Sequence, residues 1–466
     1  MLLTLPELVR RGSTIHDVVI VGSGPAAIAT AYALEQQGVA STLLESGEAD
    51  KSEEWNVRTE GFLPADYGVA ASYPQLHIRR ELGGGMSVWG GWCSAMRETS
   101  FARPDIPAYP GWPIRKTDLI AHYRRAGEFL KIAGAEQALV DAIPIGQTGL
   151  TAKPFRFSPP VRFADFRDHI AESKKITLVT GATVVGLKGF GGHIDGVNVR
   201  YNDGAKTLSC RSSVVLAGGA VGNARIIALS ANVGISSNSQ SFVGKYLFEH
   251  PHCYSLAKVV FAPHVESLVA DRTYWSDRFI SLAPSQEFLT QQRVTDFNFQ
   301  LWPIGDGDLG PRELAISKNY ELIYGVKAQF YNATLGMEQA SHIAANSVLD
   351  NDTLEHKNDG HLVLDLSVQE KVIAVARKWL ISCGLHAWVS TNAKPSIVAV
   401  GHLHGTTRMA ADDKNGVVDI NCRVFGMRNL FVAGSSVFPT AGFTNPTFTI
   451  AALALRLGDY LAKEAT

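Results

Sequence analysis

Two polar residues near the C-terminal end are the side chains best suited to chemistry. His402 lies in the segment GHLHGTTRM, and Asn445 follows in GFTNPTFT. A neutral imidazole can take a proton at working pH, and a carboxamide can hold an oxygen by hydrogen bonding. A glycine-rich segment near the N-terminus, VVIVGSGPAAIATAYALEQQG, has the spacing of a dinucleotide fingerprint. Together the two ends predict a flavin enzyme whose fold returns the C-terminus to a cofactor held by the N-terminus.

The N-terminal segment predicts a strand, a tight turn and a helix in direct succession. Residues 18–21 are apolar, as in a buried parallel strand, and Gly22 and Gly24 allow a tight turn beneath a pyrophosphate. The helix N-terminus would bind the diphosphate, and Ala27 replaces the usual third glycine. Glu45 ends the next strand, where its carboxylate can accept hydrogen bonds from a ribose. An ordinary helix-capping glycine turn is the alternative interpretation.

Two further glycine-rich segments interrupt the middle of the chain. RRELGGGMSVWGGWC, residues 79–93, suits a loop whose backbone passes close to a large flat group, with a flexible hinge as the alternative. SSVVLAGGAVGNARIIALS, residues 212–230, predicts an apolar strand, a Gly pair and a helix. We expect this strand to close the cofactor domain.

Composition agrees with a two-domain enzyme and excludes several other classes. The chain has 466 residues, a formal net charge of −1, 46% hydrophobic and 19% charged residues, and no basic patch that would indicate nucleic-acid binding. We expect a cytoplasmic protein, because no apolar run is long enough to cross a bilayer and the N-terminus lacks secretory-signal features. Its five cysteines are scattered, which argues against a disulfide framework and a zinc ribbon.

The motifs, in their order along the chain, resemble those of the glucose–methanol–choline (GMC) family of FAD-dependent oxidoreductases. They are GSGPAA with Glu45, LGGGMSVWGG, VVLAGGAVGNARIIALS, VGKYLFEHPH, and HLHGTTRM with GFTNPTFT. They are most similar to the bacterial pyranose-oxidase-like, gluconate-dehydrogenase-like branch. The resemblance implies an α/β fold (α+β overall), with a Rossmann-like FAD-binding domain and a substrate-binding domain whose antiparallel sheet is covered by helices.

The resemblance also implies that both domains are discontinuous. We expect residues 1–103, 178–258 and 399–466 to form the FAD-binding domain, and residues 104–177 and 259–398 the substrate domain. A Pro-rich linker over residues 104–114 would lead into the first insertion.

Within the insertions, periodicity predicts several elements. Residues 117–134 form an amphipathic first helix, residues 361–368 form part of an antiparallel hairpin after a polar turn, and residues 368–385 form a helix. Residues 293–313 form either a lid or an ordinary surface loop.

In this family the HxxGT pattern assigns the general base, which is His402 here, with hydride passing from the alcohol carbon to flavin N5. Asn445 would hold the substrate oxygen, although it could instead cap the helix that we expect over residues 447–462. The N-terminus of that helix would face the flavin pyrimidine. His404 is the alternative base, but we expect it to point outward. His402 with His404, and His250 with His252, form HxH pairs that could suggest a metal site, but the required further ligands do not accompany either pair.

The resemblance predicts non-covalent FAD, because Trp89 occupies the position at which covalently flavinylated members have a histidine. We expect the following residues to form the FAD site: Gly22, Gly24, Pro25, Ala26, Glu45, Ser46, Arg80, Gly84, Gly85, Met86, Ser87, Trp89, Gly90, Gly91, Ala217, Gly218, Gly434, Ser435, Asn445, Pro446 and Thr447.

The expected reaction is oxidation of a sugar, glycoside or polyol, with Trp89, Trp92 and Phe443 as candidates to stack on a sugar face. The electron acceptor stays open among dioxygen, a quinone and a protein. Two other functions also stay open: an FAD-containing lyase of the same fold, and an electron-transfer flavoprotein subunit that depends on a partner.

Overall fold

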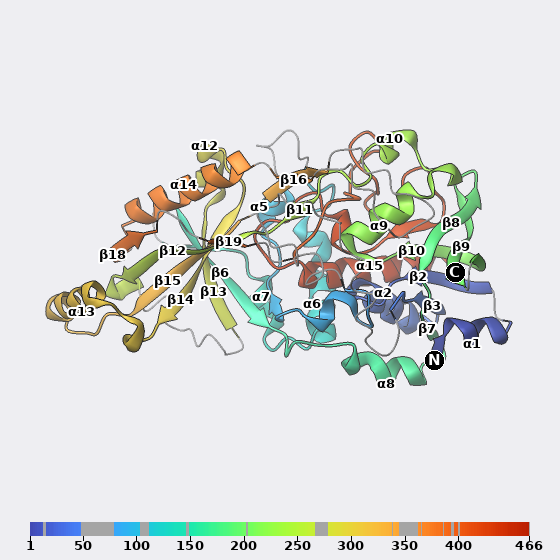
Figure 1. Cartoon of the computed structure of the whole chain (residues 1–466), viewed down its shortest axis with the longest axis horizontal. Coiled ribbons are helices and arrows are strands. Elements are labelled where there is room, and N and C mark those ends of the chain that lie inside the picture. Colours follow the sequence, from blue (N-terminus) through green and yellow to red (C-terminus); the bar gives the residue numbers. More distant parts are fainter. Residues whose placement is uncertain are drawn as a thin grey trace.

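The computed structural model of the chain forms two lobes that lie side by side along its longest axis (Figure 1). One lobe is built on a mostly parallel sheet and contains both termini, whereas the other is built on an antiparallel sheet. The structure describes residues 1–12, 15–47, 79–102, 111–145, 149–201, 204–265, 278–337, 339–343, 362–364, 366–384, 386–392, 396–398 and 401–465.

The first sheet has the strand order β1-β7-β3-β2-β10-β9-β8, and β20 also pairs with β10. Its pairings are parallel except for β8 with β9 and β9 with β10. The strands are β1 Leu2–Thr4, β2 Ile15–Val21, β3 Ser41–Leu44, β7 Ile176–Thr180, β8 Val184–Phe190, β9 His193–Tyr201, β10 Gly204–Leu216 and β20 Leu430–Val432.

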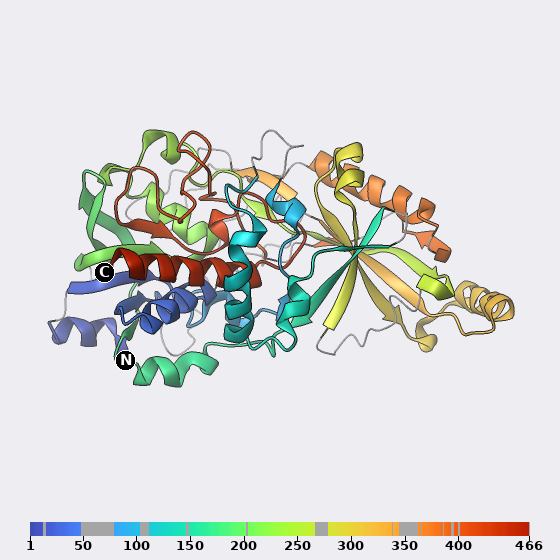
Figure 2. The same cartoon turned by 180° about the vertical axis from the view of Figure 1, so that it is seen from behind.

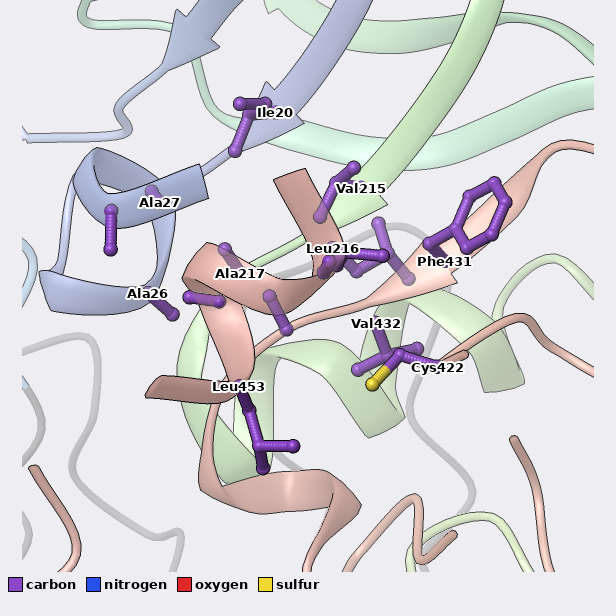
Figure 3. Close-up of a cluster of buried hydrophobic side chains, with 14 of the residues drawn as sticks. Ile20, Ala26, Ala27, Val215, Leu216, Ala217, Cys422, Phe431, Val432 and Leu453 are labelled. Atoms are coloured by element: carbon purple, nitrogen blue, oxygen red, sulfur yellow. The ribbon is translucent and has the colours of Figure 1, made fainter. Parts of the chain in front are cut away.

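Strand β2 pairs parallel with both of its neighbours, and its apolar side chains are covered on both faces of the sheet. Val18, Val19 and Ile20 are all buried, as expected for a strand between layers of helices. Helix α2 (Pro25–Gln36) follows at once and packs against the C-terminal helix α15 (Thr447–Glu464). Figure 3 shows side chains from β2, α2, β10, β20 and α15 meeting in this core. The N-terminal and C-terminal segments therefore pack together in one hydrophobic core.

Close approach of α15 to α2 depends on a glycine. A Cβ at Gly458 would lie 2.5 Å from the Cβ of Ala33 and 2.8 Å from the carbonyl oxygen of Thr30. Helix α15 is two residues longer than the expected 447–462.

Strand β10 lies inside the sheet, so the expectation that it closes the cofactor domain is wrong. Its second half pairs with β2 on one side and with β20 on the other, whereas its first half pairs with β9. β10 can serve three neighbours because it is long enough to extend beyond β2.

The second sheet has the order β18-β12-β15-β14-β13-β6-β4, with β19 beside β12 and β5 beside β6, and its pairings are antiparallel. The strands are β4 Trp92–Cys93, β5 Ile143–Ile145, β6 Leu150–Phe157, β12 His252–Phe261, β13 Arg278–Pro284, β14 Phe297–Ile304, β15 Phe330–Met337, β18 His386–Thr391 and β19 Ser396–Val398. The helices of this lobe are α12 Gln286–Gln292, α13 Pro311–Tyr324 and α14 Leu366–Ser382.

Residues 293–313 form neither a lid nor a surface loop, because most of them belong to β14 and the start of α13. Phe297 and Phe299 of β14 are buried against Trp379 of α14. Alternating apolar side chains therefore fix this strand in the middle of the sheet.

The other insertion elements agree with expectation in part. A small third sheet joins β11 (Phe248–Glu249), β16 (Gln339–Ile343) and β17 (Leu362–Leu364), and β16 and β17 pair antiparallel as the hairpin prediction requires. The strand is shorter than expected, because α14 begins at Leu366. The polar turn before it and most of the expected Pro-rich linker lie outside the described residues.

The amphipathic segment 117–134 packs against the first lobe. Its helix α6 (Ile120–Phe129) lies beside α15, as Figure 2 shows, and the Tyr123 hydroxyl is 2.7 Å from Thr449 Oγ1. Arg125 also forms an ion pair of 2.5 Å with Asp459 of α15. The amphipathic pattern predicted a helix but not which lobe it would cover.

Short elements complete the described fold. They are α1 Leu5–Arg10, η2 Gly84–Ser87, α5 Glu98–Phe101, η3 Lys116–Leu119, α7 Ala135–Leu139, α8 Ala164–Glu172, α9 Gly219–Ala228, η4 Ala231–Val233, α10 Ser237–Gln240, η5 Asp306–Asp308 and η6 Ser435–Val437. The expected domain boundaries after residues 177 and 258 fall inside β7 and β12. Within the described part of the chain, no helix is both long and apolar enough to span a membrane.

Candidate active site

A cavity of about 700 Å³ lies where the parallel strands of the first sheet end. His402 and most of the residues expected to bind FAD line it. Those expected residues are Gly22, Gly24, Pro25, Ala26, Glu45, Ser46, Arg80, Gly84, Gly85, Met86, Trp89, Gly90, Ala217, Gly218, Gly434, Ser435, Asn445, Pro446 and Thr447. Ser87 and Gly91 do not line the cavity.

At the Gly22–Gly24 turn, Gly22 leaves no room for a side chain. Gly22 has φ +113°, and a Cβ there would lie 2.6 Å from the carbonyl oxygen of Ala217. On the other side, a Cβ at Gly84 would lie 3.5 Å from the Cα of Gly24. Because Gly24 is also the N-cap of α2 and has no side chain to cap the helix, the first N–H groups of α2 are available to an anion in the cavity.

Glu45 is buried at the cavity wall and already hydrogen-bonded. Ser23 Oγ donates to one carboxylate oxygen at 2.5 Å, and the Gly47 N–H donates to the other at 2.8 Å. Ser23 Oγ in turn accepts from the Gly83 N–H at 3.0 Å. Burial raises the pKa of Glu45, and these hydrogen bonds oppose the rise. The carboxylate is therefore fixed in place by the turn and by the 79–93 loop.

In the 79–93 loop, Trp89 lines the cavity and Gly91 packs against the backbone of Ser158. The indole Nε1 of Trp89 donates to the carbonyl oxygen of Val161 at 2.8 Å. Gly91 has φ +79°, and a Cβ there would lie 2.5 Å from the carbonyl oxygen of Ser158. Gly91 thus serves close backbone packing rather than a flexible hinge.

His402 and Asn445 meet at the cavity wall. The Asn445 Nδ2 atom lies 3.4 Å from His402 Nε2. Asn445 does not cap α15, whose N-cap is Pro446 and has no side-chain capping bond. Its side chain instead contacts His402 and lines the cavity.

The backbone around His402 is held by bonds to two other segments. The His402 N–H donates to Glu249 Oε1 at 2.9 Å. Ser435 Oγ donates to the carbonyl oxygen of Leu403 at 2.6 Å, and the Gly405 N–H donates to the carbonyl oxygen of Ser435 at 3.1 Å. Glu249 and Ser435 thus fix the backbone on both sides of His402.

His250 is a neighbour of His402 that sequence reasoning considered only as a metal ligand. Its Nδ1 lies 3.3 Å from Nδ1 of His402. Burial, followed by the nearby His404 and His252, lowers the pKa of His250 well below its usual range. His250 is therefore neutral at physiological pH. No group of three or more potential metal-binding side chains occurs among the residues that the structure describes.

His404 is fully buried, so the expectation that it points outward is wrong. Its ring lies 4.7 Å from that of His250 and 5.7 Å from that of Phe438, between centroids. Simple alternation fails because this segment is not a regular strand. His404 does not line the cavity, whereas His402 does.

Sequence reasoning missed the far end of the cavity. Residues 182–185, Arg200 and Arg225 contribute to its lining. Burial, with a contribution from Arg200, lowers the pKa of Arg225. The residues 182–185 and Arg200 carry no motif, whereas Arg225 follows a Gly pair on a predicted helix and could have been found from that position.

Comparisons with known proteins agree with this geometry. Residues 384–454 match the family model described as GMC oxidoreductase. The chain is 23% identical to the 2-methyl-1,2-propanediol dehydrogenase of Mycolicibacterium austroafricanum over 96% of this chain and 95% of that protein. A C-glycoside 3-oxidase of Microbacterium trichothecenolyticum is 43% identical, but the match spans only 16% of this chain and 15% of the oxidase.

A solved structure shows the same fold. It is an FAD-dependent oxidoreductase from Chaetomium thermophilum, with a TM-score of 0.58 at 14% identity, over 96% of this chain and 99% of that one.

Proposed function

We propose that the chain is a GMC oxidoreductase and that it uses FAD to oxidise an alcohol group of a sugar, glycoside or polyol to a carbonyl. One observation carries the proposal. The His402–Asn445 pair lies in the wall of the same cavity that the Gly22–Gly24 turn and Glu45 line. A proton acceptor and a cofactor cradle thus share one cavity.

The cavity residues fit a dinucleotide. Close packing at Gly22 and the lack of a side chain at Gly24 leave backbone N–H groups facing a pyrophosphate. Glu45 would accept hydrogen bonds from the ribose. Trp89 cannot form a covalent bond to a flavin, so we expect non-covalent FAD. When bound, FAD would accept two electrons from the alcohol.

The position of the paired histidines is consistent with His402 as the base. If His402 carries its proton on Nδ1, its Nε2 keeps a lone pair, and the neutral His250 beside it adds no positive charge. That Nε2 faces Asn445. A substrate hydroxyl bound there transfers its proton to Nε2 as the C–H bond breaks, and Asn445 holds the oxygen in position.

The substrate class is supported by relatives whose names refer to C-glycoside oxidation and to a propanediol. Both reactions act on alcohols. The electron acceptor stays open among dioxygen, a quinone and a protein.

An anaerobic screen of sugars, polyols and glycosides tests the proposal. We expect at least one to abolish the flavin absorbance at about 450 nm. A lyase of this fold would bind FAD without being bleached by any alcohol. A partner-dependent electron-transfer subunit would bleach rapidly but turn over only with artificial acceptors. Absence of bleaching across the panel would overturn the proposal.

A further inference from the structure

The two faces of the second sheet differ in chemistry. Along β14, Phe297 and Phe299 point to the helix-covered core, so Asn298 and Gln300 point to the opposite face. On that opposite face Asn298 is paired with Gly336 of β15, and Gly336 is paired with His252 of β12. The register thus brings polar side chains from separate strands into one row.

Three of these polar groups converge over Gly336. A Cβ at Gly336 would lie 2.5 Å from Asn298 Oδ1, 3.4 Å from Gln300 Nε2 and 3.4 Å from His252 Nε2. Gln300 Nε2 and His252 Nε2 are themselves 3.4 Å apart. Glycine at this position leaves the point of convergence free of side-chain atoms.

Asn298 is buried without hydrogen bonds. It is 0% exposed, and neither its Oδ1 nor its Nδ2 has a partner among the described residues. Leaving a buried amide unbonded costs on the order of 1–3 kcal/mol. Such groups are rare in folded proteins and call for a reason. A ligand that supplies the missing partners is such a reason.

This row of side chains adjoins the cavity at two points. His250, which contacts His402 at 3.3 Å, is only two residues before His252. Trp92 lines the cavity, and its ring centroid lies 4.9 Å from that of Phe279 and 6.0 Å from that of Trp302, the next outward residue after Gln300 on β14. Asn298, Gln300 and His252 do not line the cavity themselves, but these two contacts connect their row to the wall that contains His402 and Trp92.

We infer that Asn298, Gln300 and His252 form a subsite that binds the non-reacting hydroxyls of a neutral ring compound carrying several hydroxyl groups. The reacting carbinol of the same molecule lies at His402, so this inference rests on the proposed function. Carboxamides both donate and accept hydrogen bonds, as hydroxyls do. Binding therefore supplies Asn298 with the partners that it lacks.

The charge of the subsite excludes ionic ligands. Burial lowers the pKa of His252 to about 4, which leaves its imidazole neutral at physiological pH. Asp296, directly before β14, is paired with Arg97 at 2.5 Å, and Lys153 donates to the carbonyl oxygen of Val140 at 2.6 Å. Hydroxyl groups match the three neutral side chains better than a carboxylate or an ammonium group does.

Asn298→Leu tests the subsite, because leucine has a similar shape but cannot form hydrogen bonds. The probes are D-glucose, D-xylose, methyl β-D-glucopyranoside and myo-inositol, with cyclohexanol as the ring alcohol that has a single hydroxyl. We expect KM for the polyhydroxylated reductants to rise roughly 10- to 100-fold in anaerobic flavin reduction, and KM for cyclohexanol to stay unchanged. The Tm of the substrate-free protein should stay the same or rise, because no native hydrogen bond is lost.

Asn429→Leu is the matched control for stability. Asn429 is also a buried asparagine, but its amide bonds to the backbone of Ile194 and Ser212. Its substitution should lower Tm without changing the KM ratio between polyhydroxylated compounds and cyclohexanol. Gly336→Ala is a second variant: its methyl group fills the point of convergence and should raise the same KM values.

The outcomes separate the subsite from the proposed function. If Asn298→Leu lowers Tm as Asn429→Leu does and leaves the KM ratio unchanged, Asn298 is structural and the inference is wrong. Equal kcat/KM of the wild type for cyclohexanol and for the polyhydroxylated probes would also overturn it, while oxidation of both would still support alcohol oxidation. If no alcohol bleaches the flavin, the proposed function itself fails and the subsite with it.

Discussion

Glu45 at the cofactor cavity and Asn298 on the polar face of the second sheet are both buried, but they differ in their hydrogen bonding. At the cavity, both carboxylate oxygens of Glu45 accept hydrogen bonds from the protein. On the sheet face, Asn298 has none from the described residues. The Glu45 carboxylate is hydrogen-bonded before any ligand arrives, as suits a cofactor that stays bound. The second region is completed by a molecule that must also leave.

The same contrast extends to the backbone. Around the cavity, Gly22 and Gly84 let main-chain segments approach one another closely. On the second sheet, Gly336 instead leaves space in front of three side chains. Glycine thus serves packing in one lobe and recognition in the other.

Among the substitutions proposed, that of His402 should have the largest effect, and it should act on the rate of flavin reduction. We expect His402→Ala to retain FAD and to slow flavin reduction by roughly 10²- to 10⁴-fold, the usual contribution of a positioned general base. Stopped-flow reduction measures the rate. The wild-type rate should rise with pH as the imidazole loses its proton, and the variant should lose that dependence. His404→Ala is the control, because His404 lies outside the cavity. A wild-type rate in His402→Ala would reassign the base.

The buried ion pair between the lobes should contribute more to stability than any exposed pair. Arg97 and Asp296 are 2.5 Å apart with side chains 3% exposed, and the Arg97 guanidinium lies over the Phe443 ring at 5.0 Å. We expect Asp296→Asn to lower the free energy of unfolding by roughly 3–5 kcal/mol, because it leaves a buried charge unpaired.

The control for this prediction is the exposed pair Arg124–Glu136, where Glu136→Gln should cost less than about 1 kcal/mol. Urea denaturation measures both variants. Equal losses in the two would show that the pair between the lobes has no special role.

Gly22→Ala tests whether the cavity turn is as crowded as its geometry indicates. Its φ of +113° and the 2.6 Å approach to Ala217 should together cost more than the roughly 1–3 kcal/mol of backbone strain alone, and should weaken FAD retention. Gly38→Ala is the control, because Gly38 has φ +77° with open space around it. Thermal unfolding with and without added FAD compares them. Similar losses in both variants would mean that strain, and not crowding, requires Gly22.

Local patterns predicted one region better than the other. The strand, Gly turn and helix from Val18 through α2 depend on short-range signals, and the structure has all three. The convergence at Gly336 depends on the register of three strands that are distant in sequence, so no local pattern could reveal it. The contact of His250 with His402 is likewise tertiary. Periodicity failed for His404 because the segment has no regular secondary structure.

Substitution of Glu45 should have the smallest effect of these changes, but the direction of its pH dependence is well defined. Burial raises its pKa in the folded protein, so its favourable contribution is fully present below the pKa of the unfolded chain. That contribution is lost as pH rises through the folded pKa. Tm of FAD-free Glu45→Gln should therefore fall less than wild-type Tm as pH rises. Glu7→Gln should have the opposite effect, because hydrogen bonds from Thr4 lower the Glu7 pKa.

In the holoenzyme, Glu45→Ala should weaken FAD binding by about 1.5–3 kcal/mol, the value of hydrogen bonds to a charged acceptor. Unchanged FAD affinity by equilibrium dialysis would remove Glu45 from the ribose site.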